Sequence, residues 1–252
     1  MPAVPEALRR LPALPGTGFL LFAAATAATI AGSLSMQDMG KVPMPGGWTL
    51  STAWMPMCGQ SWAGAATSFT GMWVVMMVSM MLPALLPQLR RYPPGPAALA
   101  GAGYFFVWAV LGMIVFALGA AVTQALLQMN TVASTVPALS GLVVLLAGGF
   151  QFTARKARHL ACYRQPPVYL LNSASDAWRH GLRLGQHCIS SCAGLTALLL
   201  VWGVMDLRAM ALVTAAITAE RQAPDGQAVA RLQGTAAIAA GLLMTARAVW
   251  PA

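Results

Sequence analysis

The sequence predicts an all-α fold, a polytopic transmembrane helical bundle of about seven spans, with six spans as the alternative. Hydrophobic residues make up 58% of the 252 residues and charged residues only 8%, whereas soluble domains carry about 25% charged residues. Several apolar runs approach the ~20 residues that a membrane helix needs, without the alternation of a membrane β-strand. These observations exclude a soluble globular enzyme, a disordered chain and a coiled coil, and predict a single integral membrane domain over residues 1–252.

Seven apolar segments are predicted to cross the membrane as α-helices, because helices satisfy their own backbone hydrogen bonds in lipid. In chain order they are 17–36, 69–86, 99–124, 137–153, 186–204, 207–219 and 234–250. The segment 207–219 is short for a span, which is why six spans remains the alternative. Arg9 and Arg10 precede the first segment as in a signal peptide, but its apolar run exceeds the usual 7–15 residues. A retained signal-anchor is therefore expected.

The positions of Lys and Arg predict the orientation of the chain. With a cytoplasmic N-terminus, twelve of the fifteen basic residues lie inside, and Lys41, Arg208 and Arg247 lie outside. This agrees with the positive-inside rule, so the net charge of +9 indicates topology, and the expected partner is the lipid bilayer, with no nucleic acid. Two long connections follow: an outer, Met-rich loop over 37–68 and a basic cytoplasmic loop over 154–185.

The outer loop carries sulfur side chains that are candidate metal ligands. Thioethers and thiolates are soft ligands that select Cu(I) over hard cations. The candidates are Met36, Met39, Met55, Met57 and Cys58. Pro and Gly residues between them prevent a regular helix, so that several sulfurs could converge. The alternative is a loop on the membrane surface, where Met and Trp make interfacial contacts.

The second predicted span carries methionines at helical spacing. Met76 and Met80 share one stripe of the helix, and Met77 and Met81 form the neighbouring stripe. These four residues are candidate copper ligands along a path through the membrane. The alternative is packing, because Met commonly fills gaps between helices.

The fifth predicted span begins with a group of thiols and an imidazole. Cys188 and Cys192 are four residues apart and face one side of a helix, with His187 beside that face. Two thiols and an imidazole suit Cu(I) or Zn(II) once the thiols lose their protons. The alternative is a pair of inert, buried cysteines.

Two further groups have both a structural and a functional interpretation. His159 and Cys162, in the basic loop, could share a ligand face, although a cytoplasmic helix on anionic lipid headgroups is the simpler interpretation. Asp206 is expected to cap the helix that follows it. Glu220 is expected to pair with the adjacent Arg221.

Residues from about 48 to 224 resemble the DUF2182 family, which is described as predicted metal-binding integral membrane proteins of bacteria. The resemblance is carried by 73–83, which matches the family's W..M..AMM.P run, by 149–156, by 187–207 and by Glu220 with Arg221. His159 and Tyr163 stand where the family often has Cys, and Ser191 replaces one Cys of a CC pair. The resemblance implies a multi-pass protein of the bacterial inner membrane that binds metal.

The leading hypothesis is an integral membrane metal-handling protein that binds Cu(I), or alternatively zinc, for transfer, storage or transport. A metallochaperone or a membrane complex is the expected partner, and no catalytic role is expected. The alternative is a non-catalytic scaffold or assembly subunit of a larger complex, in which the Met-rich and Gly-rich helices only pack. A membrane enzyme with a redox metal or thiols is a third interpretation.

Overall fold

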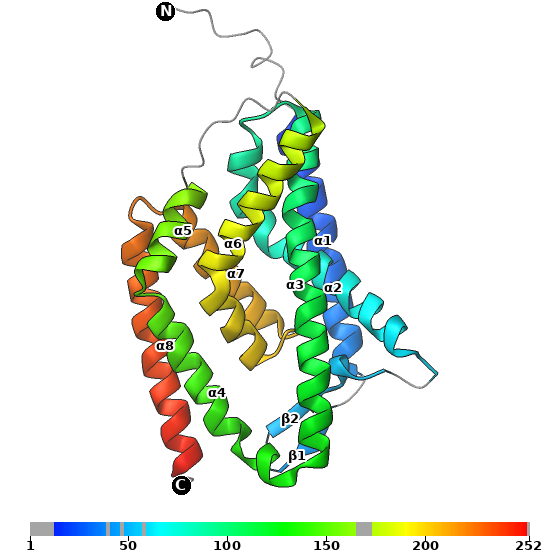
Figure 1. The fold of residues 1–252 in the computed structure, drawn as a ribbon, viewed down its shortest axis with the longest axis vertical. Helices are drawn as coiled ribbons and strands as arrows, with labels where there is room; N and C mark the ends of the chain where they lie inside the picture. The colour runs from blue at the N-terminus through cyan, green and yellow to red at the C-terminus, as the bar shows by residue number, and fades with distance from the viewer. Residues whose placement is uncertain (1–12, 39–40, 46–47, 57–58, 165–172, 251–252) are drawn as a thin grey trace, which may run out of the picture.

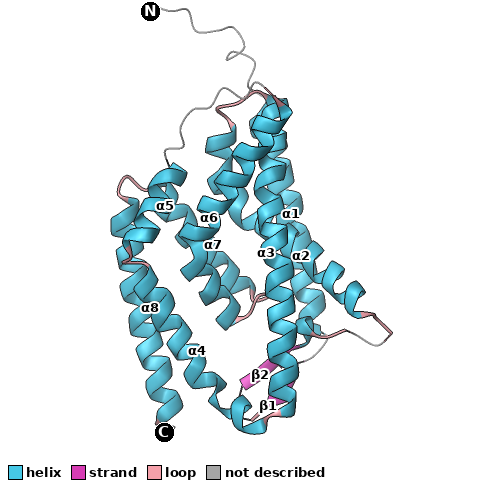
Figure 2. Cartoon of the chain, viewed as in Figure 1, coloured by secondary structure: helices cyan, strands magenta, loops and turns pink. Residues whose placement is uncertain are grey.

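The computed structural model describes residues 13–38, 41–45, 48–56, 59–164 and 173–250, and most of them are helical (Figure 1). Figure 2 shows a bundle of helices with one small sheet near one end. The eight α-helices of the described residues are α1 (Ala13–Asp38), α2 (Trp62–Leu89), α3 (Pro94–Gln128), α4 (Asn130–Phe150), α5 (Ala154–Arg164), α6 (Ala174–Trp202), α7 (Leu207–Gln222) and α8 (Gly226–Val249). The predicted all-α bundle is confirmed.

Six of these helices are long and apolar enough to cross a membrane: α1, α2, α3, α4, α6 and α8. They correspond to six of the seven predicted spans. The remaining segment, 207–219, lies in α7, whose 16 residues rise about 24 Å, less than the ~30 Å of a hydrocarbon core. By length, α7 therefore differs from those six helices, and it packs inside the bundle as a shorter helix.

Helices α6 and α7 lie between two groups of helices (Figure 1). In one group α1 packs on α2 and α2 on α3, and in the other α4 packs on α8. α6 contacts α3, α4, α5 and α7, while α7 contacts α2, α6 and α8. Side chains of α6 and α7 that face inward are therefore at the centre of the bundle.

Small residues set the separation of two helix pairs. A Cβ added to Gly148 of α4 would lie 2.9 Å from the carbonyl oxygen of Gly234 in α8. A Cβ on Gly103 of α3 would lie 2.7 Å from the carbonyl oxygen of Trp178 in α6. Backbones of membrane helices approach this closely only where side chains are small. The α4–α8 and α3–α6 contacts are thus backbone against backbone.

The predicted outer loop contains regular structure. Strand β1 (Lys41–Met44) pairs antiparallel with β2 (Trp48–Ser51), and a 3-10 helix, η2 (Thr52–Trp54), follows. The indole Nε1 of Trp48 donates to the carbonyl oxygen of Ala133 at 2.9 Å, which attaches this hairpin to the first turn of α4. Helix α2 begins at Trp62, before the predicted 69, because Ser61 caps it by accepting from the Gly64 N–H at 3.1 Å.

The predicted cytoplasmic loop contains α5 and the first turns of α6. The Ser173 hydroxyl caps α6 by accepting from the Asp176 N–H at 3.1 Å. The helix expected over 186–204 therefore begins about three turns earlier, at Ala174. As a result, the segment from His187 to Cys192 lies in the middle of a helix.

The turn between α6 and α7 fixes where α7 begins. Gly203 has a φ of +116°, a conformation that L-residues with a Cβ rarely adopt. Three residues later the Asp206 carboxylate accepts from the Ala209 N–H at 2.8 Å, so the predicted cap is confirmed. Figure 1 shows this turn part-way along the bundle, short of the end where α4 begins.

Candidate metal centre

Cys188 and Cys192 lie on the inner face of α6 at the centre of the bundle. Their exposed fractions are 0% and 1%, and both belong to the large buried cluster that includes residues of α2, α3 and α7. One helical turn separates them, so their sulfurs face the same side. Burial alone fits both ligands and inert cysteines, and the chemistry of their neighbours distinguishes these two interpretations.

The neighbours of the two sulfurs are polar groups from two other helices, α7 and α3, and a third helix, α5, contacts the guanidinium. Nη2 of Arg221, in α7, donates to the Sγ atoms of Cys188 at 2.9 Å and of Cys192 at 2.8 Å. The hydroxyl oxygen of Tyr104, in α3, lies 2.8 Å from the Cys188 Sγ. The guanidinium carbon lies 3.9 Å from the centre of the Tyr163 ring in α5. A neighbouring cation favours the thiolate, which is the reactive and metal-binding form of cysteine.

The predicted pair of Glu220 with Arg221 is wrong. Glu220 Oε1 instead accepts from Lys156 Nζ, in α5, at 2.7 Å, and both side chains are almost completely buried. Lys156 also donates to the side-chain oxygen of Gln151 at the end of α4. Adjacent residues of a helix do not face each other, so Glu220 and Arg221 reach different partners. Lys156 is therefore a buried partner of α7 and does not lie on lipid headgroups.

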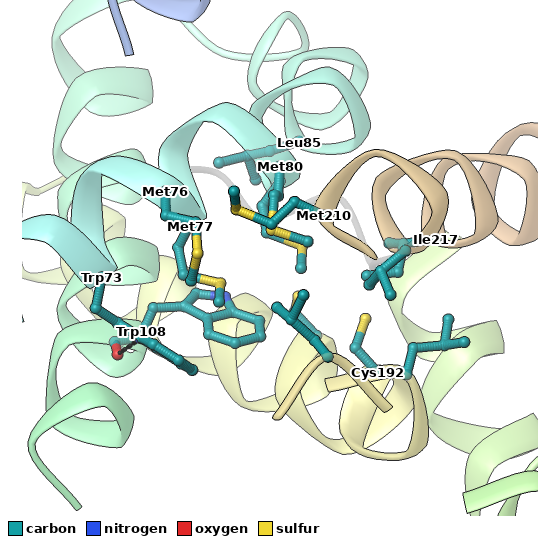
Figure 3. Close-up of a cluster of buried hydrophobic side chains, with 14 of the residues drawn as sticks. Trp73, Met76, Met77, Met80, Leu85, Trp108, Cys192, Met210 and Ile217 are labelled. Atoms are coloured by element: carbon teal, nitrogen blue, oxygen red, sulfur yellow. Dashed lines mark hydrogen bonds between the residues drawn. The ribbon is translucent and has the colours of Figure 1, made fainter. Parts of the chain in front are cut away.

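The methionines of α2 belong to the same buried cluster as the cysteines. Figure 3 shows Met76, Met77 and Met80 of α2 with Met210 of α7 and Cys192 of α6. All of these side chains are less than 5% exposed, and Met81 is buried in the same cluster. The structure thus gathers thiols and thioethers, which are soft ligands, at the contact of α2, α6 and α7.

Sequence reasoning missed Met210 and the role of Arg221. A single Met in a short helix has no periodic signal, and its place beside the α2 methionines depends on the α2–α7 contact. For Arg221 a weak signal exists, because the chain has 15 basic and only 6 acidic residues. Most basic residues therefore cannot have a carboxylate partner.

His159 and His187 form a second pair of candidate ligands, where α5 contacts α6. Their Nδ1 atoms are 3.1 Å apart, and both residues are half-buried. Burial, together with the neighbouring His187, Arg155 and Arg158, lowers the pKa of His159. Its imidazole is therefore mainly neutral at pH 7, the form that binds metals. Cys162, predicted to share a face with His159, is exposed.

The outer candidates are only partly described. Met55 follows η2 and is half-buried, and Met36 belongs to the last turns of α1. Met39, Met57 and Cys58 lie outside the described residues. Convergence of this outer group on a metal ion stays a prediction.

Within the described ranges, no three His, Cys, Asp or Glu side chains come together as a metal site. A metal centre at Cys188 and Cys192 would therefore need other ligands to complete it, and the thioethers of the same buried cluster are candidates of matching softness.

Fold and site together define a class: a helical bundle with six helices long and apolar enough to cross a membrane, and with two buried thiols, several thioethers and one guanidinium at its centre. Soft ligands in this setting indicate the handling of a soft metal ion. A family model described as "PpoB2: Copper chaperone" matches residues 70–244, and the chain therefore belongs to this copper chaperone family. No curated protein and no solved structure gives a significant match.

The family match spans both cysteines, Arg221 and the methionines of α2 and α7. The outer candidates, from Met36 to Cys58, precede residue 70 and lie outside it. The match therefore associates copper with the part of the chain that contains the buried sulfur cluster.

Proposed function

We propose that this protein is an integral membrane copper chaperone that holds Cu(I) on sulfur ligands inside the bundle and passes it to a partner protein. The observation that carries the proposal is the pair of fully buried cysteines in the same buried cluster as the α2 methionines. Membership of a copper chaperone family supports copper as the cargo. The resemblance to DUF2182 supports metal binding in a membrane protein.

The proposed ligands are Cys188 and Cys192, completed by Met80 and Met210, with Met76 as a neighbouring thioether. Thiolate and thioether ligands favour Cu(I). Zinc usually takes four Cys, His or carboxylate ligands in a tetrahedral structural site, and two cysteines provide only half of that set. The ligand set therefore favours copper over zinc.

His159 and His187 are proposed as a further station for copper, because two imidazoles from neighbouring helices face each other. The outer sulfur group is proposed to collect copper on the opposite side of the membrane. The distribution of basic residues supports a multi-pass protein of the bacterial inner membrane with a cytoplasmic N-terminus. A soluble metallochaperone or a membrane complex would exchange copper with it.

The test is metal binding to the full-length protein purified in detergent under reducing, anaerobic conditions. Cu(I) is added in excess, unbound metal is removed, and bound copper is measured by mass spectrometry. We expect bound copper in the wild type and fewer copper ions per molecule in Cys188→Ser and in Cys192→Ser, because the other proposed stations remain. Cys162→Ser is the matched control, because Cys162 is exposed on α5, and it should retain copper.

Copper binding that is equal in all four proteins would overturn the cysteine site. A wild type that binds no copper, and that co-purifies with a stoichiometric membrane partner, would instead favour the scaffold function. Circular dichroism of each variant establishes that the loss of copper is not a loss of fold.

A further inference from the structure

Arg221 is a buried cation without a carboxylate partner among the described residues. Its exposed fraction is 8%, and a guanidinium stays protonated in proteins. The nearby carboxylate, Glu220, is bound to Lys156. An uncompensated charge inside a membrane protein is costly, so the groups that contact Arg221 have a compensating role.

The groups that can compensate the charge of Arg221 are the sulfurs of Cys188 and Cys192. Nη2 of Arg221 donates to both Sγ atoms, while Nη1 is buried without a hydrogen-bond acceptor in the described part of the chain. The Tyr163 ring lies against the guanidinium and contributes a cation–π interaction, which carries no negative charge of its own. The groups that contact Arg221 here and can become anions, by losing their protons when they bind a metal, are therefore the thiols of Cys188 and Cys192.

The charges at this point depend on the metal ion that binds there. Cysteine binds metals as the thiolate, so two cysteine ligands carry two negative charges, and Arg221 neutralises one of them. A monovalent cation then brings the buried charge to zero, whereas a divalent cation leaves one positive charge. Lys156 and Glu220 cancel each other and do not change this sum.

We infer that Arg221 is the specificity-determining residue of the cysteine site, and that it makes the site bind monovalent soft cations, Cu(I) and Ag(I), in preference to divalent Zn(II). The inference rests on the proposed function, because it assigns a role at the same two cysteines. Arg221 acts through its charge and is not itself a ligand.

The experiment compares the full-length wild type with Arg221→Lys, which keeps the charge, and Arg221→Met, which removes it at similar side-chain length. Affinities for Ag(I), a monovalent probe that is not oxidised in air, and for Zn(II) are measured by competition with chelators in detergent. We expect wild type and Arg221→Lys to prefer Ag(I). In Arg221→Met the ratio of Ag(I) to Zn(II) affinity should fall by about 100-fold, as expected when one charge of a buried pair is removed.

The ratio of Ag(I) to Zn(II) affinity separates a charge effect from a general loss of structure, because a loss of structure would weaken the binding of both metals. An unchanged ratio in Arg221→Met, with silver still dependent on both cysteines, overturns the specificity role alone. A wild type that binds neither Ag(I) nor Cu(I) overturns the proposed function and this inference with it. If Arg221→Met does not fold, Arg221→Gln replaces it as the neutral variant, with the same two outcomes.

Discussion

The contact between α4 and α8 differs from the contact of α6 with α7 in what holds the helices together. Along α4 and α8, glycines bring the two backbones into contact, and apolar side chains such as Leu146 and Leu242 remain exposed on the outer surface. Around α7, the contacts are made by long side chains that carry charge or sulfur. The comparison indicates that one contact is specialised for close packing and the other for chemistry, so the two should respond differently to substitution.

The largest effect should follow from breaking the buried ion pair. Glu220→Gln leaves the Lys156 ammonium buried without a carboxylate, which should lower the free energy of unfolding by about 3–5 kcal/mol. Thermal unfolding in detergent, followed by circular dichroism, measures this loss. Lys156→Met combined with Glu220→Gln removes both charges and should recover most of the stability; a single variant as stable as the wild type would contradict the pairing.

The α4–α8 contact should be sensitive to size instead of charge. In Gly148→Leu the new side chain meets the Gly234 carbonyl of α8, so we expect a loss of about 1–3 kcal/mol from overpacking. The neighbouring Gly149 has no atom within 4 Å of an added Cβ, which makes Gly149→Leu the matched control. Copper bound per folded molecule should be the same in both variants. A loss of copper in folded Gly148→Leu would contradict the view that the α4–α8 contact only packs and that the metal site depends on the contact of α6 with α7.

Met80→Leu tests whether Met80, at the contact of α2 with α6 and α7, binds copper or only fills space between the helices. A volume-conserving exchange in a core costs less than about 1.5 kcal/mol, so thermal stability should change little. Because the substitution removes a thioether, the affinity for Cu(I) should fall if Met80 is a ligand. Met113→Leu, at a methionine of α3 that is 52% exposed, should change neither quantity; equal copper affinity in both variants would assign Met80 to packing alone.

The smallest effect should come from Tyr104→Phe, which removes the hydroxyl at 2.8 Å from the Cys188 sulfur. Loss of one buried hydrogen bond costs about 1 kcal/mol. The midpoint of thermal unfolding should therefore decrease slightly, and Arg221 should still hold the site's preference for monovalent cations. A change in metal preference as large as that of Arg221→Met would show that Tyr104 shares the role of Arg221.

Composition and the length of the apolar runs predicted the fold because both report directly on the lipid environment. Helical spacing separately predicted that Cys188 and Cys192 share one face of a helix, and in the structure both sulfurs accept from Arg221; their role as metal ligands stays a prediction. The partners of Arg221, Glu220 and Met210 could not be predicted in the same way. These contacts depend on how α5, α6 and α7 pack, which is a property of the tertiary structure and leaves no period in the sequence.

The start of α6 shows a second limit of sequence reasoning. The first turns of α6 are polar, so the hydropathy pattern predicted that the helix begins near residue 186. In the structure Ser173 caps the helix, which begins at Ala174. For α7 the hydropathy pattern predicted a helix at the correct residues, but it could not predict how far along the bundle this helix lies. That depth depends on the turn at Gly203 and on the contacts of α7 with α2 and α8.

The shortness of α7 has a consequence for how the protein is made. A 16-residue helix with Arg208, Glu220 and Arg221 is a poor substrate for insertion by itself, because each such charge costs about 2.5–3.5 kcal/mol at the centre of a bilayer. The partners of Glu220 and Arg221 are Lys156, Tyr163, Cys188 and Cys192. All four precede α7 in the chain, so they are synthesised before α7 and are available to compensate the charges of Glu220 and Arg221 when α7 folds against them.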